Sequence, residues 1–220
     1  MDDAFILSHV DHTLLSATAS WEQIDKLCRE SIEFKTASIC VPPNYVKRIR
    51  SAYPDINLGT VIGFPLGYDT ITVKAVAVQM AVEDGADELD MVINLSDVKN
   101  ADFDIIRVEI SVLKQIAGAK ILKVIVETCY LTEEEKITLC KVVTEAGADY
   151  IKTSTGFGTA GATLADVELF KAHIGPDVKI KAAGGIRSRE DMVALLEAGC
   201  ARLGTSSAVR LLTGGKAGAY

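Results

Sequence analysis

Five charged residues stand inside short apolar segments that are typical of buried strands. They are Asp90 in DELDMVIN, Lys123 in LKVIVET, Lys152 in YIKTS, Lys181 in KIKAAGG and Asp11 in VDHTLL. Side chains of a strand point alternately to its two faces, and the aliphatic neighbours of each charged residue take one face. The charged side chains therefore take the other face, and we expect them to meet at a shared centre.

A cluster of this kind points to chemistry, because buried charges require partners or a perturbed pKa and add little stability. Lysines that repel one another lower one another's pKa, and a neutral lysine amine attacks a carbonyl carbon to form a Schiff base. An adjacent carboxylate can then carry the protons. The residues themselves leave Lys123, Lys152 and Lys181 as equal candidates for the nucleophile. The alternative is that each charge is solvated at a strand end, as we expect for Lys179.

An internal repeat indicates how the chain brings these residues together. The segments EDGADELD (83–90), EAGADYIK (145–152) and EAGCARLG (197–204) each combine a helix end, a glycine stop and an apolar strand. The repeat places Asp90, Lys152 and Gly204 at equivalent positions along three strands.

Eight short apolar runs, separated by helical patterns, predict eight βα units. The runs lie near residues 9–13, 37–41, 57–62, 88–93, 122–127, 149–153, 178–182 and 202–205. Residues with the spacing of a capping box predict that helices begin at Ser20, Thr132 and Ser188. The apolar stripe of the first of these helices comprises Ile24, Leu27, Cys28 and Ile32.

The units predict an α/β fold, a (β/α)8 TIM barrel that forms one domain over residues 1–220. Eight units of about 27 residues each leave room for a strand, a helix and two short loops. A doubly wound open sheet is the alternative, but no G-x-G-x-x-G turn follows the first strand, where a dinucleotide-binding fold has it. Hydrophobic residues make up 49% of the chain and aromatic residues 6%, which suits an aliphatic parallel sheet covered on both faces.

Charge and termini restrict the class of partner. The net charge of -7 argues against nucleic acid and anionic membranes as main partners and favours a small metabolite. The acidic start MDDAF does not have the pattern of a signal peptide, and no run approaches the roughly 18 apolar residues of a membrane helix, so we expect a cytoplasmic protein. Five scattered cysteines predict reduced thiols, and three separated histidines do not indicate a metal centre. We also expect no cofactor.

Gly-rich loops after the last three predicted strands indicate a phosphate site. A (β/α)8 barrel commonly holds a phosphate on the backbone amides of these loops. The alternative is that the glycines only form turns and that Ser206 only caps a helix. The candidate residues in STGFGTAG, AAGGIRS and GTSS are Gly156, Gly184, Gly185, Arg187, Gly204, Ser206 and Ser207.

Over nearly its whole length the sequence resembles the deoxyribose-phosphate aldolase family, whose members are class I aldolases with a barrel fold. The motifs that carry the resemblance are GADELDMVIN, LKVIVET, YIKTSTGFGTAGAT, IKAAGGIRS and RLGTSS, together with VDHTLL and ASICVPP near the N-terminus. The resemblance implies a lyase that reversibly cleaves 2-deoxy-D-ribose 5-phosphate to D-glyceraldehyde 3-phosphate and acetaldehyde, without a metal, in deoxyribose catabolism.

The resemblance also implies a role for each charged residue. Lys152 matches the Schiff-base lysine, Lys181 the second lysine that perturbs it and Asp90 the acid/base carboxylate, which leaves Lys123 and Asp11 as supporting charges. We expect the Lys181 ammonium to lie about 4 to 6 Å from that of Lys152, where repulsion lowers the pKa of Lys152. The loops AAGGIRS and GTSS match the family's phosphate loops.

Three further positions carry expectations. Phe157 stands where some relatives have a lysine, which lowers the expected affinity for phosphate. Tyr220, the last residue, is either a proton relay or a frayed terminus. Cys40, at the C-terminal end of the second predicted strand, is either buried packing or an accessible thiol that unsaturated aldehydes alkylate.

Two other functions are compatible with the pattern. One is a metal-free isomerase or transaldolase acting on another phosphosugar, which would release no acetaldehyde. The other is a regulator that binds a phosphosugar without chemistry, and the set of Asp90, Lys152 and Lys181 argues against it. In each case we expect a small-molecule ligand and a homo-oligomer, either a dimer or a tetramer.

Overall fold

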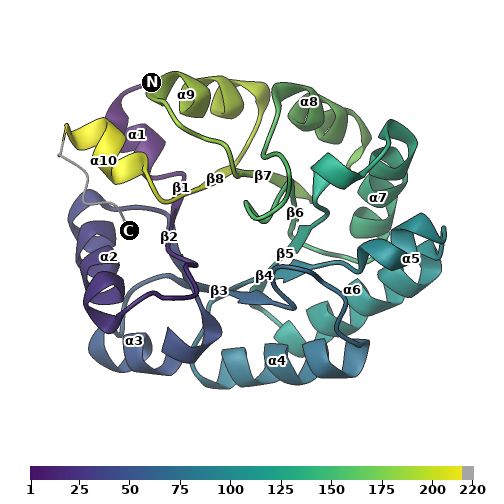
Figure 1. The fold of residues 1–220 in the computed structure, drawn as a ribbon, viewed down its shortest axis with the longest axis horizontal. Coiled ribbons are helices and arrows are strands. Elements are labelled where there is room, and N and C mark those ends of the chain that lie inside the picture. Colours follow the sequence, from purple (N-terminus) through teal and green to yellow (C-terminus); the bar gives the residue numbers. More distant parts are fainter. Residues whose placement is uncertain (215–220) are drawn as a thin grey trace.

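Eight parallel strands close into a barrel in the computed structural model, which describes residues 1–214 (Figure 1). The strands follow one another around the barrel in sequence order, and the last pairs with the first. The predicted (β/α)8 barrel is therefore confirmed, and the open-sheet alternative is wrong. The strands are β1 (Val10–Thr13), β2 (Ser38–Val41), β3 (Leu58–Ile62), β4 (Glu88–Val92), β5 (Ile121–Ile125), β6 (Tyr150–Lys152), β7 (Lys179–Ala183) and β8 (Arg202–Thr205).

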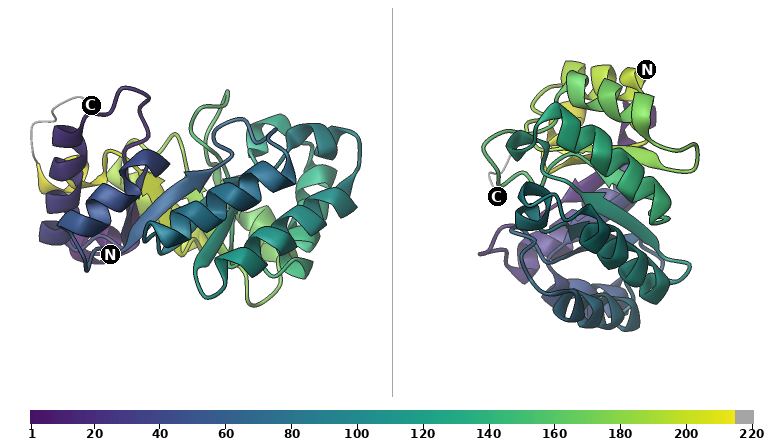
Figure 2. Two further views of the ribbon diagram at one scale, coloured as in Figure 1. Left: turned by 90° about the horizontal axis from the view of Figure 1, so that it is seen from below. Right: turned by 90° about the vertical axis from the view of Figure 1, so that its right-hand side faces the viewer.

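Helices form an outer ring around the barrel (Figures 1 and 2). The α-helices are α1 (Asp3–Leu7), α2 (Trp21–Phe34), α3 (Val46–Ala52), α4 (Ile71–Glu83), α5 (Leu95–Lys99), α6 (Phe103–Ala117), α7 (Glu133–Glu145), α8 (Leu164–His173), α9 (Arg189–Ala198) and α10 (Ala208–Thr213). Two short 3-10 helices, η1 (Pro43–Tyr45) and η2 (Thr128–Tyr130), follow β2 and β5. None of the helices within residues 1–214 is both long enough and apolar enough to cross a membrane.

Three helices begin at the predicted capping boxes. Ser20, Thr132 and Ser188 each accept a hydrogen bond from a backbone N–H three residues later, and the side chain of that later residue accepts one from the backbone N–H of the capping residue. The predicted stripe of α2 is wrong at one position, because Ile32 is 55% exposed while Ser31 is buried. With 3.6 residues per turn, the position seven residues after Ile24 lies on the buried stripe and the next one turns away from it.

The strands separate an aliphatic layer from a polar interior. Leu89, Ile151 and Ile180 face outwards and are buried in the core between the strands and the helices. Each such side chain contributes about 1.5–3 kcal/mol by leaving water. The alternation along the strands sends the neighbouring residues, such as Asp90 and Lys152, into the barrel.

Candidate active site

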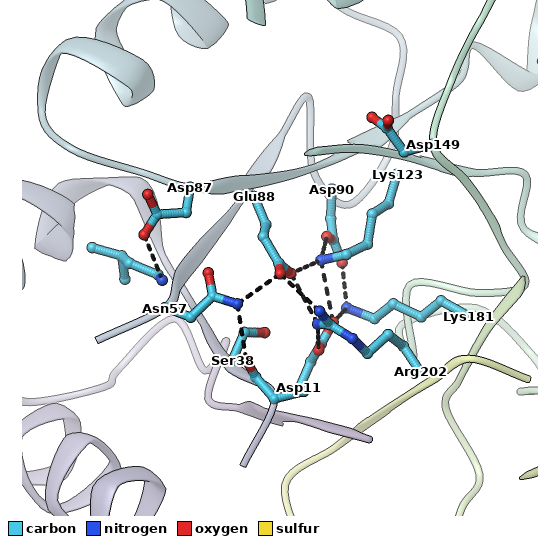
Figure 3. Close-up of polar contacts among 12 residues, drawn as sticks. Asp11, Ser38, Asn57, Asp87, Glu88, Asp90, Lys123, Asp149, Lys181 and Arg202 are labelled. Atoms are coloured by element: carbon cyan, nitrogen blue, oxygen red, sulfur yellow. Dashed lines mark hydrogen bonds and ion pairs between the residues drawn. The ribbon is translucent and has the colours of Figure 1, made fainter. Parts of the chain in front are cut away.

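Asp90 accepts hydrogen bonds from three lysines in the barrel interior, and Figure 3 labels two of them, Lys123 and Lys181. Lys123 Nζ donates to Asp90 Oδ1 over 2.9 Å, while Lys152 Nζ and Lys181 Nζ both donate to Oδ2 over 2.7 Å. All four side chains are buried. Strand register places Lys123 beside Asp90 and Lys181 beside Lys152, so the expected meeting of the charged side chains is found.

Asp11 and Glu88 add two further carboxylates to this cluster. Asp11 Oδ2 lies 2.5 Å from Lys181 Nζ and 3.2 Å from Lys123 Nζ, and Glu88 Oε2 lies 2.5 Å from Lys123 Nζ. Arg202 closes the cluster, because its guanidinium donates to Asp11 over 2.6 Å and to Glu88 over 3.1 Å. Such pairing is what allows charged groups to remain in a buried site.

The cluster contains three carboxylates and four basic groups. The carboxylates of Asp11, Glu88 and Asp90 face Lys123, Lys152, Lys181 and Arg202. Their charges balance when one of the basic groups is neutral. The site therefore favours one uncharged lysine among the three.

The environment favours the neutral form more at Lys152 than at Lys123 or Lys181. Burial lowers the pKa of Lys152, and the neighbouring Lys181 lowers it further, while Asp90 opposes both effects. Burial also disfavours the charged forms of Lys123 and Lys181, but their carboxylate partners outweigh it and raise both pKa values. Burial would raise the pKa of Asp90, yet the three lysines hold it well below its usual range, so that this carboxyl is ionised.

Cys40 is packed in the barrel interior. Its side chain is 1% exposed, and burial raises the pKa of the thiol to about 11. It lies near enough to Asp90 and Lys152 for their charges to act on it. The structure therefore favours the packing interpretation over the accessible, alkylated thiol, since the thiolate is the reactive form.

A cavity of about 460 Å³ opens at the C-terminal ends of β6, β7, β8 and β1. Its lining includes every residue that the sequence predicts for phosphate binding, namely Gly156, Gly184, Gly185, Arg187, Gly204, Ser206 and Ser207. This edge of a (β/α)8 barrel is where active sites form. We call this space the polar cavity.

Glycine is required where the loops of the polar cavity approach each other. Gly184 has a φ of 77°, and a Cβ there would lie 3.2 Å from the Cα atoms of Gly156 and Gly161. The loops after β6 and β7 are thus in backbone contact. Gly204 lies deeper, where a Cβ would lie 3.1 Å from Cε of Lys181, so this glycine makes room for the lysine rather than only for a ligand.

Four residues of the site were missed by the sequence analysis. Glu88 and Arg202 point into the barrel. The alternation of side chains along the strand is enough to predict this direction for Glu88, because Glu88 stands two residues before Asp90. Glu127 is buried after β5 in a left-handed conformation and accepts hydrogen bonds from the backbone and hydroxyl of Thr155. Arg210, in α10, lines the polar cavity. Neither of these last two lies in a strand, so alternation gives no signal for them.

Two remaining expectations concern the rim and the terminus. Phe157 lines the polar cavity and is 59% exposed, and its ring meets that of Phe64 edge to face, with centroids 5.3 Å apart. Tyr220 lies outside the described residues.

Comparison with known proteins agrees with this geometry. The sequence profile of the DeoC/LacD family aldolase matches residues 5–215. A deoxyribose-phosphate aldolase of Clostridium botulinum (strain Eklund 17B / Type B) is 60% identical over 100% of both chains. One from Clostridioides difficile (strain 630) is 54% identical over 94% of this chain and 95% of the relative.

A solved structure has the same fold. The deoxyribose phosphate aldolase of Aeropyrum pernix, described as a unique tetrameric structure, has a TM-score of 0.90 and 34% identity, and the match covers 96% of this chain and 91% of that one. The profile, the relatives and the barrel agree with the resemblance that the strand and loop motifs indicate. The chain belongs to the DeoC/LacD family of aldolases.

Proposed function

We propose that this aldolase cleaves 2-deoxy-D-ribose 5-phosphate reversibly to D-glyceraldehyde 3-phosphate and acetaldehyde through a Schiff base on Lys152. The observation that carries the proposal is the charge balance of the cluster. Three carboxylates balance Lys123, Lys181 and Arg202, which leaves Lys152 able to be neutral and nucleophilic. Named relatives with this activity support the choice of substrate.

The reaction follows from the positions of Lys152 and Asp90. The neutral Lys152 amine adds to C1 of the open-chain sugar, and loss of water gives an iminium. Removal of the proton from the C3 hydroxyl breaks the C2–C3 bond, and the electron pair moves to the iminium nitrogen to give an enamine. Protonation at C2 and addition of water release acetaldehyde and the free amine. Asp90, ionised and 2.7 Å from Lys152 Nζ, carries protons in these steps.

The polar cavity supplies the proposed phosphate subsite. Gly184, Gly185 and Ser206 line this cavity and would offer backbone amides to the phosphate oxygens, and Arg187 and Arg210 add positive charge. Arg210 offsets the absence of a lysine at Phe157. We place this reaction in deoxyribose catabolism in the cytoplasm, with no cofactor.

Turnover of the purified protein tests the proposed reaction. Acetaldehyde released from 2-deoxy-D-ribose 5-phosphate is measured with a coupled alcohol dehydrogenase, before and after exhaustive treatment with EDTA. We expect release that EDTA leaves unchanged, a loss of at least roughly a thousandfold in Lys152→Ala, and little change in the exposed control Lys179→Ala. Conversion of the sugar without acetaldehyde would favour an isomerase or transaldolase, and binding without conversion would favour a regulator.

We also propose that the chain forms a homo-oligomer through α4 and α6. The side of the molecule that bears α4 faces the viewer in the left view of Figure 2. Val73, Val76 and Met80 of α4 are each more than 50% exposed, and Ile105 and Val108 of the adjacent α6 are each 46% exposed. Exposed apolar patches mark interfaces, and a second copy offers a matching patch. The relative described as tetrameric supports this assembly.

Light scattering with size-exclusion chromatography tests the assembly. We expect a dimer or tetramer for the natural chain and a smaller species for Val76→Glu. The control Ala172→Glu, at an exposed position of α8, should have the same oligomeric mass as the natural chain. A monomer, or a Val76→Glu variant that keeps its mass, would contradict the proposed interface.

A further inference from the structure

Glu127 is a buried carboxylate that the proposed reaction does not use. It follows β5 with a φ of 55°, and its side chain is only 3% exposed. Within residues 1–214, every hydrogen bond to its carboxylate comes from Thr155, whose backbone N–H donates over 3.1 Å and whose hydroxyl donates as well. Both donors are neutral groups. A carboxylate buried on neutral donors, in a left-handed backbone, adds little to stability and points to a role in function.

Thr155 passes the support of Glu127 on to the loop after β6. The Thr155 hydroxyl donates to Glu127 and accepts a hydrogen bond from the backbone N–H of Phe157 over 3.0 Å. The loop also packs directly on the carboxylate, since a Cβ at Gly158 would lie only 3.2 Å from Cδ of Glu127. Glu127 thus contacts or supports the loop at three of its residues.

This loop forms part of the wall of the polar cavity. Thr155, Gly156 and Phe157 line the cavity, whereas Glu127 does not. Gly156 in turn lies against the loop after β7, because a Cβ at Gly184 would lie 3.2 Å from the Cα atom of Gly156. Glu127 therefore acts on the proposed phosphate subsite through the loop and not by contact with a ligand.

We propose that Glu127 is a positioning residue, which holds the loop after β6 in the conformation that binds the phosphate group of the substrate. The inference rests on the proposed function. Loss of the carboxylate leaves two buried donors of Thr155 without an acceptor, so the loop moves until these donors reach water. A displacement of about 1 Å in the cavity wall weakens binding of the phosphate, while Lys152 and Asp90 keep their places on the strands.

Cleavage of the sugar with and without its phosphate tests this role. In Glu127→Ala we expect KM for 2-deoxy-D-ribose 5-phosphate to rise about tenfold or more, with kcat changed by less than about threefold. For 2-deoxy-D-ribose, kcat/KM should stay within about twofold. Glu127→Gln keeps an acceptor for the Thr155 N–H, so its rise in KM should stay below about threefold. The control Glu134→Ala, at an exposed position of α7, should leave the kinetics with both sugars unchanged.

Thr155→Val tests the same support from its other end. Valine keeps the shape of threonine but has no hydroxyl to donate to Glu127 or to accept from Phe157, so KM for the phosphorylated sugar should again rise about tenfold. In the double variant Glu127→Ala with Thr155→Val, the rise should be smaller than the product of the two single rises, because both changes break one hydrogen-bonded unit. This variant also carries the test if Glu127→Ala does not fold, as thermal unfolding would show.

Inorganic phosphate measures binding at the subsite without chemistry. We expect it to inhibit cleavage competitively, with an inhibition constant that rises about tenfold in Glu127→Ala and in Thr155→Val and stays unchanged in Glu134→Ala. Equal losses with both sugars, an unchanged inhibition constant, or a double variant whose rise equals the product of the single rises would overturn the role of Glu127. Failure of the natural chain to release acetaldehyde would instead overturn the proposed function.

Discussion

Lys152 and Lys181 donate hydrogen bonds to one and the same oxygen, Oδ2 of Asp90, each over 2.7 Å. The two Nζ atoms therefore lie no further apart than twice this distance, as the sequence led us to expect. The shared carboxylate offsets part of their repulsion, and burial is the largest cause of the lowered pKa of Lys152. Lys181 also lowers the pKa of Lys152, as the sequence led us to expect, but its effect is smaller than that of burial.

Replacing Lys181 with methionine tests its effect on Lys152. The change removes a positive charge and frees Asp90 to pair more strongly with Lys152, so the pKa of Lys152 should rise. The rate at pH 7 should fall by roughly two orders of magnitude, and the rising limb of the pH–rate profile should move to higher pH, where the amine is neutral. The matched control is Lys179→Met, at an exposed position of the same strand. A lower rate with an unmoved limb would show that Lys181 acts on the substrate instead.

Asp90→Asn should separate Schiff-base formation from proton transfer. The amide removes the charge that raises the pKa of Lys152, so the amine stays neutral and attacks the carbonyl. Turnover should nevertheless fall by about 10²- to 10⁴-fold, because the proton carrier is lost. The measurement compares the steady-state rate with the yield of adduct trapped by borohydride, and thermal unfolding confirms that the variant is folded. Turnover close to that of the natural chain would remove Asp90 from the mechanism.

Arg210→Met tests the charge of the polar cavity. Arg210 lines this cavity beside the exposed Arg187, and we expect its loss to raise KM for 2-deoxy-D-ribose 5-phosphate about tenfold with little change in kcat. The unphosphorylated sugar, 2-deoxy-D-ribose, serves as the internal control, because its kcat/KM should not change. A fall of the same size for both sugars would mean that Arg210 supports the loop and not the phosphate.

Alternation along strands accounts for most of what the sequence predicted about the site. It placed Asp11, Asp90, Lys123, Lys152 and Lys181 in the barrel, since each has aliphatic neighbours that face the helices. These predictions depend only on the period of a strand. They required no knowledge of loops or of distances between strands.

Residues outside the strands were beyond that reasoning. Glu127 follows β5 in a left-handed conformation, and nothing in the letters VET marks this turn. Arg210 reaches the polar cavity only because the chain turns into α10 after β8. The part that burial plays in the lowered pKa of Lys152 was also out of reach, because it depends on how the whole site is packed.

A buried ion pair outside the barrel interior carries a prediction about stability. Lys74 Nζ lies 2.8 Å from Glu109 Oε1 and donates to the carbonyl oxygen of Val92 over 2.8 Å, and both charged side chains are buried. Lys74→Met leaves Glu109 unpaired and should lower the free energy of unfolding by about 3–5 kcal/mol in urea titrations. The double variant Lys74→Met with Glu109→Gln should recover part of this loss.

The pH dependence of that loss checks its cause. Burial already raises the pKa of Glu109 in the natural chain, and loss of Lys74 should raise it further. A protonated Glu109 needs no cation, so the destabilisation should shrink as the pH falls through the folded-state pKa. A loss that is independent of pH would point to packing of the lysine stem and not to the unpaired charge.

Borohydride trapping with acetaldehyde tests the assignment of the nucleophile most directly. The protein is incubated with acetaldehyde and sodium borohydride, digested, and the modified peptide is located by mass spectrometry. We predict one reduced two-carbon unit on Lys152, absent in Lys152→Ala and kept in the control Lys179→Ala. An adduct confined to Lys123 or Lys181 would contradict the account.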